Sequence, residues 1–213
     1  MSDTTVLAVD TCFGACSAAV VRGAHVLGHR NQAMDRGHAE ALAPMVEAVI
    51  AESGIEFESL DKLAVTTGPG TFTGQRVGLA FMRGLRVALQ KPLVGVTSLA
   101  AMAERARRES GAAAAAAVHD AKRGEVYLEA VGRTLPARVL PFQEAVALLA
   151  EVPDLVVTGT GARRMADALG GARVIDDFAP DGIWVARLAF AIAADAVPRP
   201  LYLRAPDAKL PGR

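Results

Sequence analysis

The sequence predicts an α/β protein that contains both β-strands and amphipathic helices. Three β-rich runs open the chain, at residues 4–10, 16–21 and 24–30, and Arg22-Gly23 forms a hairpin turn between the last two. Further on, a short strand leads through a glycine-rich turn into a long helix. A chain of 213 residues, 52% of them apolar, can bury one large core or two small ones.

The charge balance gives no sign of independent nucleic-acid binding, because 23 Lys and Arg residues offset 23 Asp and Glu residues. If RNA is involved, we expect a partner to supply most of the positive charge. The start Met1-Ser2-Asp3 has no basic segment, and no apolar run approaches the roughly 18 to 20 residues of a membrane span. We therefore expect a cytoplasmic protein with no membrane contact.

Two cysteines, Cys12 and Cys16, are the only ones in the chain. They would have to form a metal site or a disulfide without help from other cysteines, so we expect small buried thiols instead.

The glycine-rich turn and the start of its helix, residues 68–76, allow two interpretations. The free N–H groups and the dipole of the helix N-terminus could hold an anion. Alternatively, the segment is an ordinary connection between a strand over 62–67 and a helix capped by Thr73. It is not a P-loop, because Gln75 stands where the Walker pattern has Lys. Nor does the glycine spacing fit a dinucleotide-binding fingerprint.

The helix that follows, over about 74–90, carries Gly78 and Gly84 in its interior. Each glycine costs a helix about 1 kcal/mol relative to alanine, so a packing reason is expected. We expect that reason to be the close approach of another helix. Arg76 and Arg83, seven residues apart, share a different face.

A second amphipathic helix is predicted over about 37–53. Pro44 lies inside this stretch, so the helix either starts near Leu42 or is kinked at the proline. His38 has no second histidine or cysteine close by, which is more typical of a solvated or capping residue than of a metal ligand.

Four blocks of sequence, at residues 6–11, 68–80, 95–99 and 120–127, occur together in the order and spacing of a known family. The chain resembles the bacterial TsaB (YeaZ) family over about residues 5–130. The resemblance implies two tandem ribonuclease-H-like lobes of the actin-like ATPase superfamily, each a mixed β-sheet with flanking helices. We place the lobes at residues 1–110 and 111–213, with the boundary after a charged helical segment that ends before Gly111.

The resemblance also implies a function. It indicates a non-catalytic accessory subunit of the complex that makes threonylcarbamoyladenosine in tRNA next to the anticodon. The implied partners are a TsaD-like catalytic subunit and a TsaE-like ATPase, with tRNA reached only through the complex and a homodimer formed when the chain is alone. No cofactor is expected on this chain by itself, and ATP with magnesium is expected only in the complex.

The expected partner interface lies on the two helices at about 37–53 and 74–90, which would pack as a bundle against the equivalent helices of the partner. Its predicted residues are His38, Leu42, Met45, Val46, Val49, Arg76, Gly78, Phe81, Met82 and Leu85.

A candidate anion or nucleotide site follows from the two halves of the chain. Asp10 ends the first strand of the first half, and Asp120 ends the first strand of the second half. The candidate residues are Asp10, Thr11, Gly70, Thr71, Thr73, Gly74 and Asp120. The simpler alternative makes both aspartates turn residues at strand ends. Cys12-Phe13 stands where the family usually has Ser-Thr, so a hydroxyl contact to phosphate at that turn is in doubt. Gln75 replaces the usual Leu, which adds a polar group near the start of the helix.

Two other classes of protein compete with this interpretation. One is a nucleotide-binding ATPase of the actin or sugar-kinase type that uses Asp10 and Asp120, and the other is a glycoprotease-like metallopeptidase. The catalytic relative has two histidines at metal-ligand spacing on a helix where this chain has only His38. No Ser-His-Asp order, paired catalytic carboxylates or Walker Lys is present. We therefore predict no catalytic residue and no metal site.

The second half is less specific. Residues 112–117 favour a helix by propensity, but the resemblance implies a strand, which we adopt. Further elements are predicted as strands at 139–140, 155–158 and 173–175, helices at 142–150, 163–169 and 183–194, and an extended tail at 198–204. Trp184, on the last helix, is expected in the core rather than stacked on a ligand.

Overall fold

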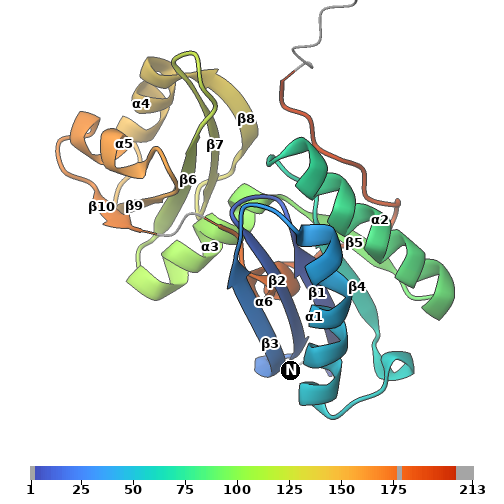
Figure 1. Ribbon diagram of the computed structural model, residues 1–213. Coiled ribbons are helices and arrows are strands. Elements are labelled where there is room, and N and C mark those ends of the chain that lie inside the picture. The colour runs from blue at the N-terminus through green and yellow to red at the C-terminus, as the bar shows by residue number, and fades with distance from the viewer. Residues whose placement is uncertain (1–2, 177–178, 205–213) are drawn as a thin grey trace, which may run out of the picture.

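Two five-stranded sheets, each with its own helices, form the two lobes of the protein (Figure 1). The structure is a computed structural model, and it describes residues 3–176 and 179–204. The elements are β1 (Thr5–Asp10), β2 (Ala15–Arg22), β3 (His25–Ala33), α1 (His38–Ser53), η1 (Phe57–Ser59), β4 (Lys62–Thr66), α2 (Phe72–Leu89), β5 (Leu93–Val96), α3 (Ser98–Ser110), β6 (Ala114–Asp120), β7 (Glu125–Val131), β8 (Leu135–Pro141), α4 (Phe142–Ala150), β9 (Leu155–Thr158), α5 (Ala162–Ala168), β10 (Arg173–Ile175) and α6 (Gly182–Ala189).

The two sheets repeat one topology. The first has the order β3-β2-β1-β4-β5, and the second has the matching order β8-β7-β6-β9-β10. The central strands β1 and β6 each pair antiparallel with the next strand and parallel with a later one. Asp10 and Asp120 therefore end corresponding strands. The predicted fold class, two ribonuclease-H-like lobes with mixed sheets, is confirmed.

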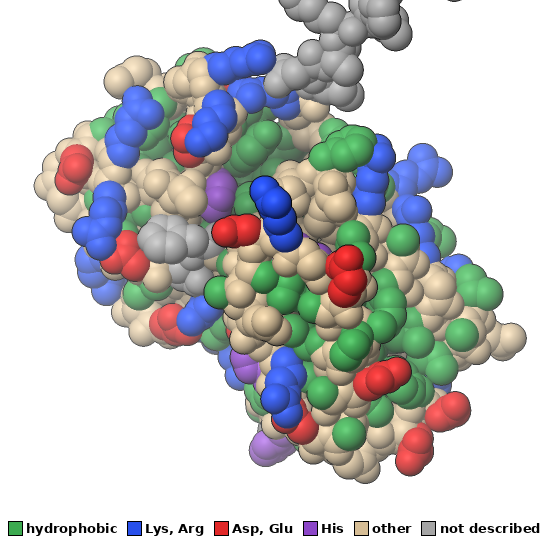
Figure 2. All heavy atoms as spheres, in the orientation of Figure 1, with side chains coloured by type: hydrophobic (Ala, Val, Ile, Leu, Met, Phe, Trp, Pro, Cys, Tyr) green, Lys and Arg blue, Asp and Glu red, His purple; other side chains and the backbone are tan. Residues whose placement is uncertain are grey.

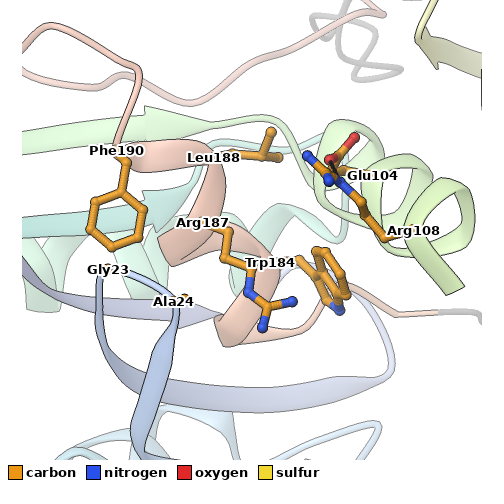
Figure 3. Close-up of a pocket in the computed structure, with 8 residues that line it drawn as sticks. All are labelled: Gly23, Ala24, Glu104, Arg108, Trp184, Arg187, Leu188 and Phe190. Carbon is orange, nitrogen blue, oxygen red and sulfur yellow. Dashed lines mark hydrogen bonds and ion pairs between the residues drawn. The ribbon is translucent and has the colours of Figure 1, made fainter. Parts of the chain in front are cut away.

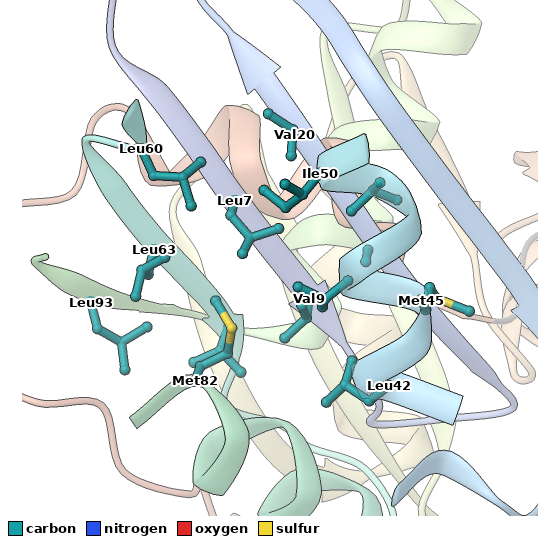
Figure 4. Packing of buried hydrophobic residues seen from close by; sticks show 14 of the residues in the cluster. Leu7, Val9, Val20, Leu42, Met45, Ile50, Leu60, Leu63, Met82 and Leu93 are labelled. Atoms are coloured by element: carbon teal, nitrogen blue, oxygen red, sulfur yellow. The ribbon is translucent and has the colours of Figure 1, made fainter. Parts of the chain in front are cut away.

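The first sheet is covered on both faces, which explains why every residue of β1 is buried. On one face, Leu7, Val9 and Val20 pack against side chains of α1 and α2 such as Leu42 and Met82 (Figure 4). The alternate residues of the same strands form a second core on the opposite face, beneath α6.

Two helices pack against sheets that their position in the sequence does not indicate. Although α6 is the last of the described helices, it packs on β1 and β2 of the first sheet. The helix α3 places Leu99 and Met102 against the second sheet, while its Ala101 belongs to the core beneath α6. A division after residue 110 would therefore separate α6 from the sheet that it covers. Residues 205–213 of the predicted second lobe lie outside the described residues.

Most predicted elements are found, and the strand preferred over a helix at 112–117 is present as β6. Its alanines pair with strands on both sides, and these hydrogen bonds outweigh their helix propensity. The helix α1 spans nearly the predicted range, and of the two alternatives at Pro44 the start near Leu42 is excluded, because the helix begins at His38 and contains the proline.

The predicted final helix at 183–194 is too long, because α6 ends at Ala189. The Lys62 ammonium donates hydrogen bonds to the carbonyls of Ala189 and Ile192, at 3.0 and 3.1 Å. This cation satisfies the carbonyl of the last residue of α6 and one carbonyl of the turn that follows.

None of the helices within residues 3–176 and 179–204 has the length and apolar content needed to cross a membrane.

Gly28 of β3 allows α1 to lie close to the sheet, because a Cβ atom at this position would overlap the carbonyl of Val49. We predict that Gly28→Val lowers the free energy of unfolding by about 1–3 kcal/mol, as expected for overpacking. Urea denaturation measures this change. The matched variant Ala33→Val, at an exposed position of the same strand, should change stability by about 0.5 kcal/mol or less. Equal stabilities of the two variants would contradict the close approach.

Candidate functional site

The end of β1 is fastened to the start of α2 by the side chain of Thr11. Its hydroxyl donates to the carbonyl of Gly74 at 2.7 Å and accepts from the N–H of Gly78 at 3.1 Å. A Cβ at Gly78 would lie 2.7 Å from this hydroxyl oxygen, and one at Gly74 would overlap the Thr11 carbonyl. The sequence predicted that another helix approaches Gly78. That prediction is wrong, because the close neighbour is Thr11 of the same chain.

The glycine-rich turn is held against the same segment. The N–H of Thr71 donates to the carbonyl of Cys12 at 2.7 Å, and a Cβ at Gly70 would overlap that carbonyl. Thr71 is also the N-cap of α2, with its hydroxyl accepting from Gly74 N–H at 3.1 Å. The predicted cap, Thr73, is instead an exposed residue of the first turn. Thr71 takes this role because its extended backbone precedes the helix and places the hydroxyl near the third residue ahead.

Asp10 lies fully buried behind this turn. Its Oδ1 accepts from the Thr66 hydroxyl at 2.5 Å and from the Cys12 N–H at 3.1 Å, whereas its Oδ2 has no hydrogen-bond partner in the described part of the chain. Burial raises the pKa of Asp10 to about 7, although the bonds from Thr66 and Cys12 oppose the shift. Near neutral pH, the protonated and ionised forms of the Asp10 carboxyl group are therefore both populated.

The thiols of Cys12 and Cys16 are free and buried, which confirms the sequence prediction. Cys12 Sγ donates to the Thr66 hydroxyl at 3.2 Å, so the thiol belongs to the same buried chain of hydrogen bonds as Asp10. Burial raises the pKa of both thiols, to about 11 for Cys16, and both therefore stay protonated.

Asp120 has the opposite environment from Asp10. It is exposed, and its carboxylate accepts from the backbone N–H of Lys122 at 2.8 Å and lies 3.2 Å from the ammonium of that residue. The backbone bond, with a smaller part from the lysine side chain, lowers the pKa of Asp120. This is the geometry of a surface turn, as the simpler alternative predicted for Asp120.

Phe13 and His119 close the space between the two strand ends. Their rings stack at 4.0 Å between centroids and 27° between planes. Burial lowers the pKa of His119 to about 4, and its Nδ1 has no hydrogen-bond partner among the described residues. A neutral ring is thus packed where β1 of one lobe and β6 of the other approach each other.

Sequence reasoning did not find His119, and it noted Phe13 only as a departure from the family pattern. The available signal was positional: His119 directly precedes Asp120, and Phe13 lies in the turn after Asp10. The duplication of the fold brings these two places together.

The candidate anion site is therefore only partly assembled. Thr11, Thr71 and Gly74 are bonded to one another, Gly70 packs against Cys12, and Asp10 behind them is bonded to Cys12 and Thr66. Thr73 adjoins this group in the first turn of α2 but is exposed, and Asp120 is exposed at the end of β6 in the other lobe. Within residues 3–176 and 179–204, no three His, Cys, Asp or Glu side chains are grouped to hold a metal ion.

The predicted interface residues divide into two sets. Leu42, Val46, Val49, Gly78 and Met82 are buried in the first lobe. These residues pack α1 and α2 against the first sheet, so a partner cannot reach them. His38 and Met45 retain only 9% and 8% exposure, and the His38 Nε2 lies 3.2 Å from the Phe13 carbonyl. The remaining set, Arg76, Phe81 and Leu85, is exposed or half-buried on α2.

Small and apolar residues form much of the outward surface of α1 and α2, and hydrophobic atoms gather over these helices in Figure 2. We call this surface the α1/α2 face. Its exposed members are Ala39, Ala43, Pro44, Ala51, Ala80, Gly84, Val87 and Ala88.

The segment after α6 runs along α2 and reaches the second lobe (Figure 1). Leu201 N–H donates to the Thr67 carbonyl at 2.8 Å, and the Arg76 guanidinium donates to the Tyr202 hydroxyl at 3.0 Å. Arg204 then donates to the Ala121 carbonyl at 2.6 Å. The tail was predicted only as extended; the structure shows that it links the two lobes.

Comparison with known proteins extends this description. Residues 26–157 match the family model described as "TsaD: tRNA N6-adenosine threonylcarbamoyltransferase". The tRNA threonylcarbamoyladenosine biosynthesis protein TsaB of Escherichia coli is 38% identical over 122 residues, which are 57% of this chain and 52% of the relative. TsaB of Haemophilus influenzae is 37% identical over 62% of this chain and 56% of its own length. The matches therefore span about half the length of these relatives.

Longer matches are found elsewhere. An uncharacterized protein of Mycobacterium tuberculosis is 34% identical over 96% of this chain and 94% of its own length. The crystal structure of YeaZ from Pseudomonas aeruginosa superimposes with a TM-score of 0.78 and 30% identity, covering 94% of this chain and all of that one. Together, the fold and these matches define a protein of two lobes, each built on a mixed five-stranded sheet of the same topology. More specifically, the chain belongs to the TsaB (YeaZ) family.

The buried carboxyl of Asp10 should make stability depend on pH. Because its pKa rises from 3.8 to about 7 on folding, the folded state binds more protons between these values, and stability falls as pH rises from about 4 to 7. The contribution is up to about 4 kcal/mol, at 1.36 kcal/mol per pKa unit. Asp10→Asn cannot ionise, so its stability relative to the native chain should increase over this range in urea denaturation.

The exposed-loop variant Asp35→Asn serves as the control and should not show this trend. A stability difference between Asp10→Asn and the native chain that is independent of pH from 4 to 8 would show that Asp10 does not take up a proton on folding.

Proposed function

We propose that this chain is a non-catalytic subunit in the synthesis of threonylcarbamoyladenosine in tRNA, at the position next to the anticodon. It acts by pairing with a TsaD-like catalytic subunit in the cytoplasm. The names of its E. coli and H. influenzae relatives support the pathway. The observation that carries the non-catalytic role is the closed turn: Thr11 and Cys12 fill the space at the glycines, and Phe13 packs on His119.

The α1/α2 face is the proposed contact with the catalytic subunit. Its small side chains allow the backbone of a partner helix to come close, and Phe81 and Leu85 supply larger apolar contacts at its edge. Arg76 adds a positive charge at the start of α2. In the absence of the catalytic subunit, the same face pairs two copies of this chain, because it repeats on each copy.

Gly84 supports this assignment more strongly than Gly78 does. A Cβ at Gly84 would have no atom within 4 Å, so nothing inside the described chain requires glycine there. The position is exposed in the middle of α2, where glycine costs about 1 kcal/mol relative to alanine. The close approach of a partner helix explains why this position is glycine.

A TsaE-like ATPase joins the pair in this proposal, and tRNA contacts the assembly mainly through the other subunits. ATP with magnesium enters only in the complex, and this chain alone holds no cofactor. The equal numbers of acidic and basic residues fit a subunit that does not gather RNA by its own charge.

Substitutions at Gly84 separate folding from association. Gly84→Ala should raise the free energy of unfolding by about 1 kcal/mol. Gly84→Gln should also leave the fold stable, but it should weaken binding to the TsaD-like subunit at least tenfold, because a long side chain holds the helices apart. Calorimetric titration with the catalytic subunit of the same organism measures the affinity.

Ala150→Gln is the matched control, since it adds the same side chain at an exposed position of α4 in the second lobe. Native affinity for Gly84→Gln, with its fold intact, would exclude the α1/α2 face as the contact.

The function itself is tested by reconstitution. The chain is combined with the catalytic subunit, the ATPase, threonylcarbamoyl-adenylate and unmodified tRNA, and modified nucleoside is measured by mass spectrometry. Modification should require this chain, and calorimetry of the isolated chain with ATP and magnesium should show no binding. Full modification without the chain would contradict the proposal, and tight ATP binding by the chain alone would favour the actin or sugar-kinase type.

A further inference from the structure

A cavity of about 520 Å³ lies on the side of the first lobe that faces away from α1 and α2. It is bordered by α3, α6 and the turn between β2 and β3 (Figure 3). The size falls within the roughly 300–1,000 Å³ of small-molecule sites. Its main lining side chains are Glu104, Arg108, Trp184, Arg187, Leu188 and Phe190.

The packing of α6 explains why these side chains point into the cavity. Val185, Ala186 and Ala189 are fully buried against the sheet. Trp184 and Leu188 are four residues apart and Arg187 lies between them, so these three share the flank that faces α3. Trp184 packs against the core beneath α6, as the sequence predicted, but it is only half-buried and also borders the cavity.

Apolar groups form one wall of the cavity. The indole of Trp184, the side chain of Leu188 and the ring of Phe190 are all half-buried around the space in Figure 3. Flat aromatic surfaces of this kind favour a flat, apolar ligand group. The wall therefore suits an aromatic ring.

Positive charge is in excess at the mouth of the cavity. The carboxylate of Glu104 already accepts hydrogen bonds from two arginines. Arg107 donates through Nε and Nη2, both at 2.9 Å, and Arg108 donates through Nε at 2.7 Å. Arg187 lies with its guanidinium carbon 4.5 Å from the Trp184 ring centroid, and it has no carboxylate partner in the described part of the chain. Its N–H donors remain available to an anion beside the aromatic wall.

We infer that this cavity binds a small molecule in which a planar aromatic ring carries an anionic group. The ring packs on Trp184 and Leu188, and the anion is bound by Arg187 with help from Arg108. Nucleoside monophosphates and aromatic carboxylates share this chemistry. The α1/α2 face covers the opposite side of the sheet, so this site does not depend on the proposed function.

The chain contains one tryptophan, so intrinsic fluorescence reports directly on this cavity. The full chain, excited at 295 nm, is titrated with adenosine 5′-monophosphate and, separately, with benzoate. At least one of the two should change the Trp184 emission saturably, and the tighter one identifies the source of the ligand. The neutral counterparts, adenosine and benzyl alcohol, should bind at least tenfold more weakly, and inorganic phosphate alone should leave the emission unchanged.

Two variants test the anion contact. Arg187→Gln and Arg108→Gln should each weaken binding of the anionic ring, the first at least tenfold, with unchanged thermal melting curves. Arg138→Gln, at a half-buried residue of β8 in the second lobe, is the matched control and should bind as the native chain does. The inference is overturned if neither anionic ring gives a saturable signal, if the neutral rings bind equally well, or if Arg187→Gln retains native affinity.

Discussion

The insertion of the Thr11 hydroxyl between two turns of α2 is the contact on which the first lobe depends. Through it the end of the central strand, the glycine-rich turn and the helix form one unit. The backbones can approach this closely only because Gly70, Gly74 and Gly78 have no side chains.

Much of the fold could be predicted because strand and helix periodicities are local signals. The partners of α3 and α6 could not, since an apolar stripe shows that a helix is covered but not by which sheet. The end of α6 could not be predicted for the same reason: Lys62, which donates to the carbonyl of Ala189, lies 127 residues away from it in sequence. The partners of α3 and α6 and the end of α6 thus depend on long-range contacts, which local sequence patterns do not reveal.

The candidate site was predictable to the same degree. Strand ends placed Asp10 and Asp120 correctly, but only burial distinguishes the protonatable carboxyl of the first from the solvated one of the second. Gly78 and Gly84 look alike in sequence, and only the structure shows that one is used inside the chain while the other faces open space. The stack of Phe13 on His119 joins two lobes and leaves no local pattern.

The return of α6 to the first sheet has a consequence for the order in which the protein is made. During synthesis the first sheet leaves the ribosome with one apolar face uncovered, because the residues that cover it are 182–189. The main core of the second lobe uses only residues between 114 and 174, so it can close earlier. The lobe that is translated first is thus the last to be completed.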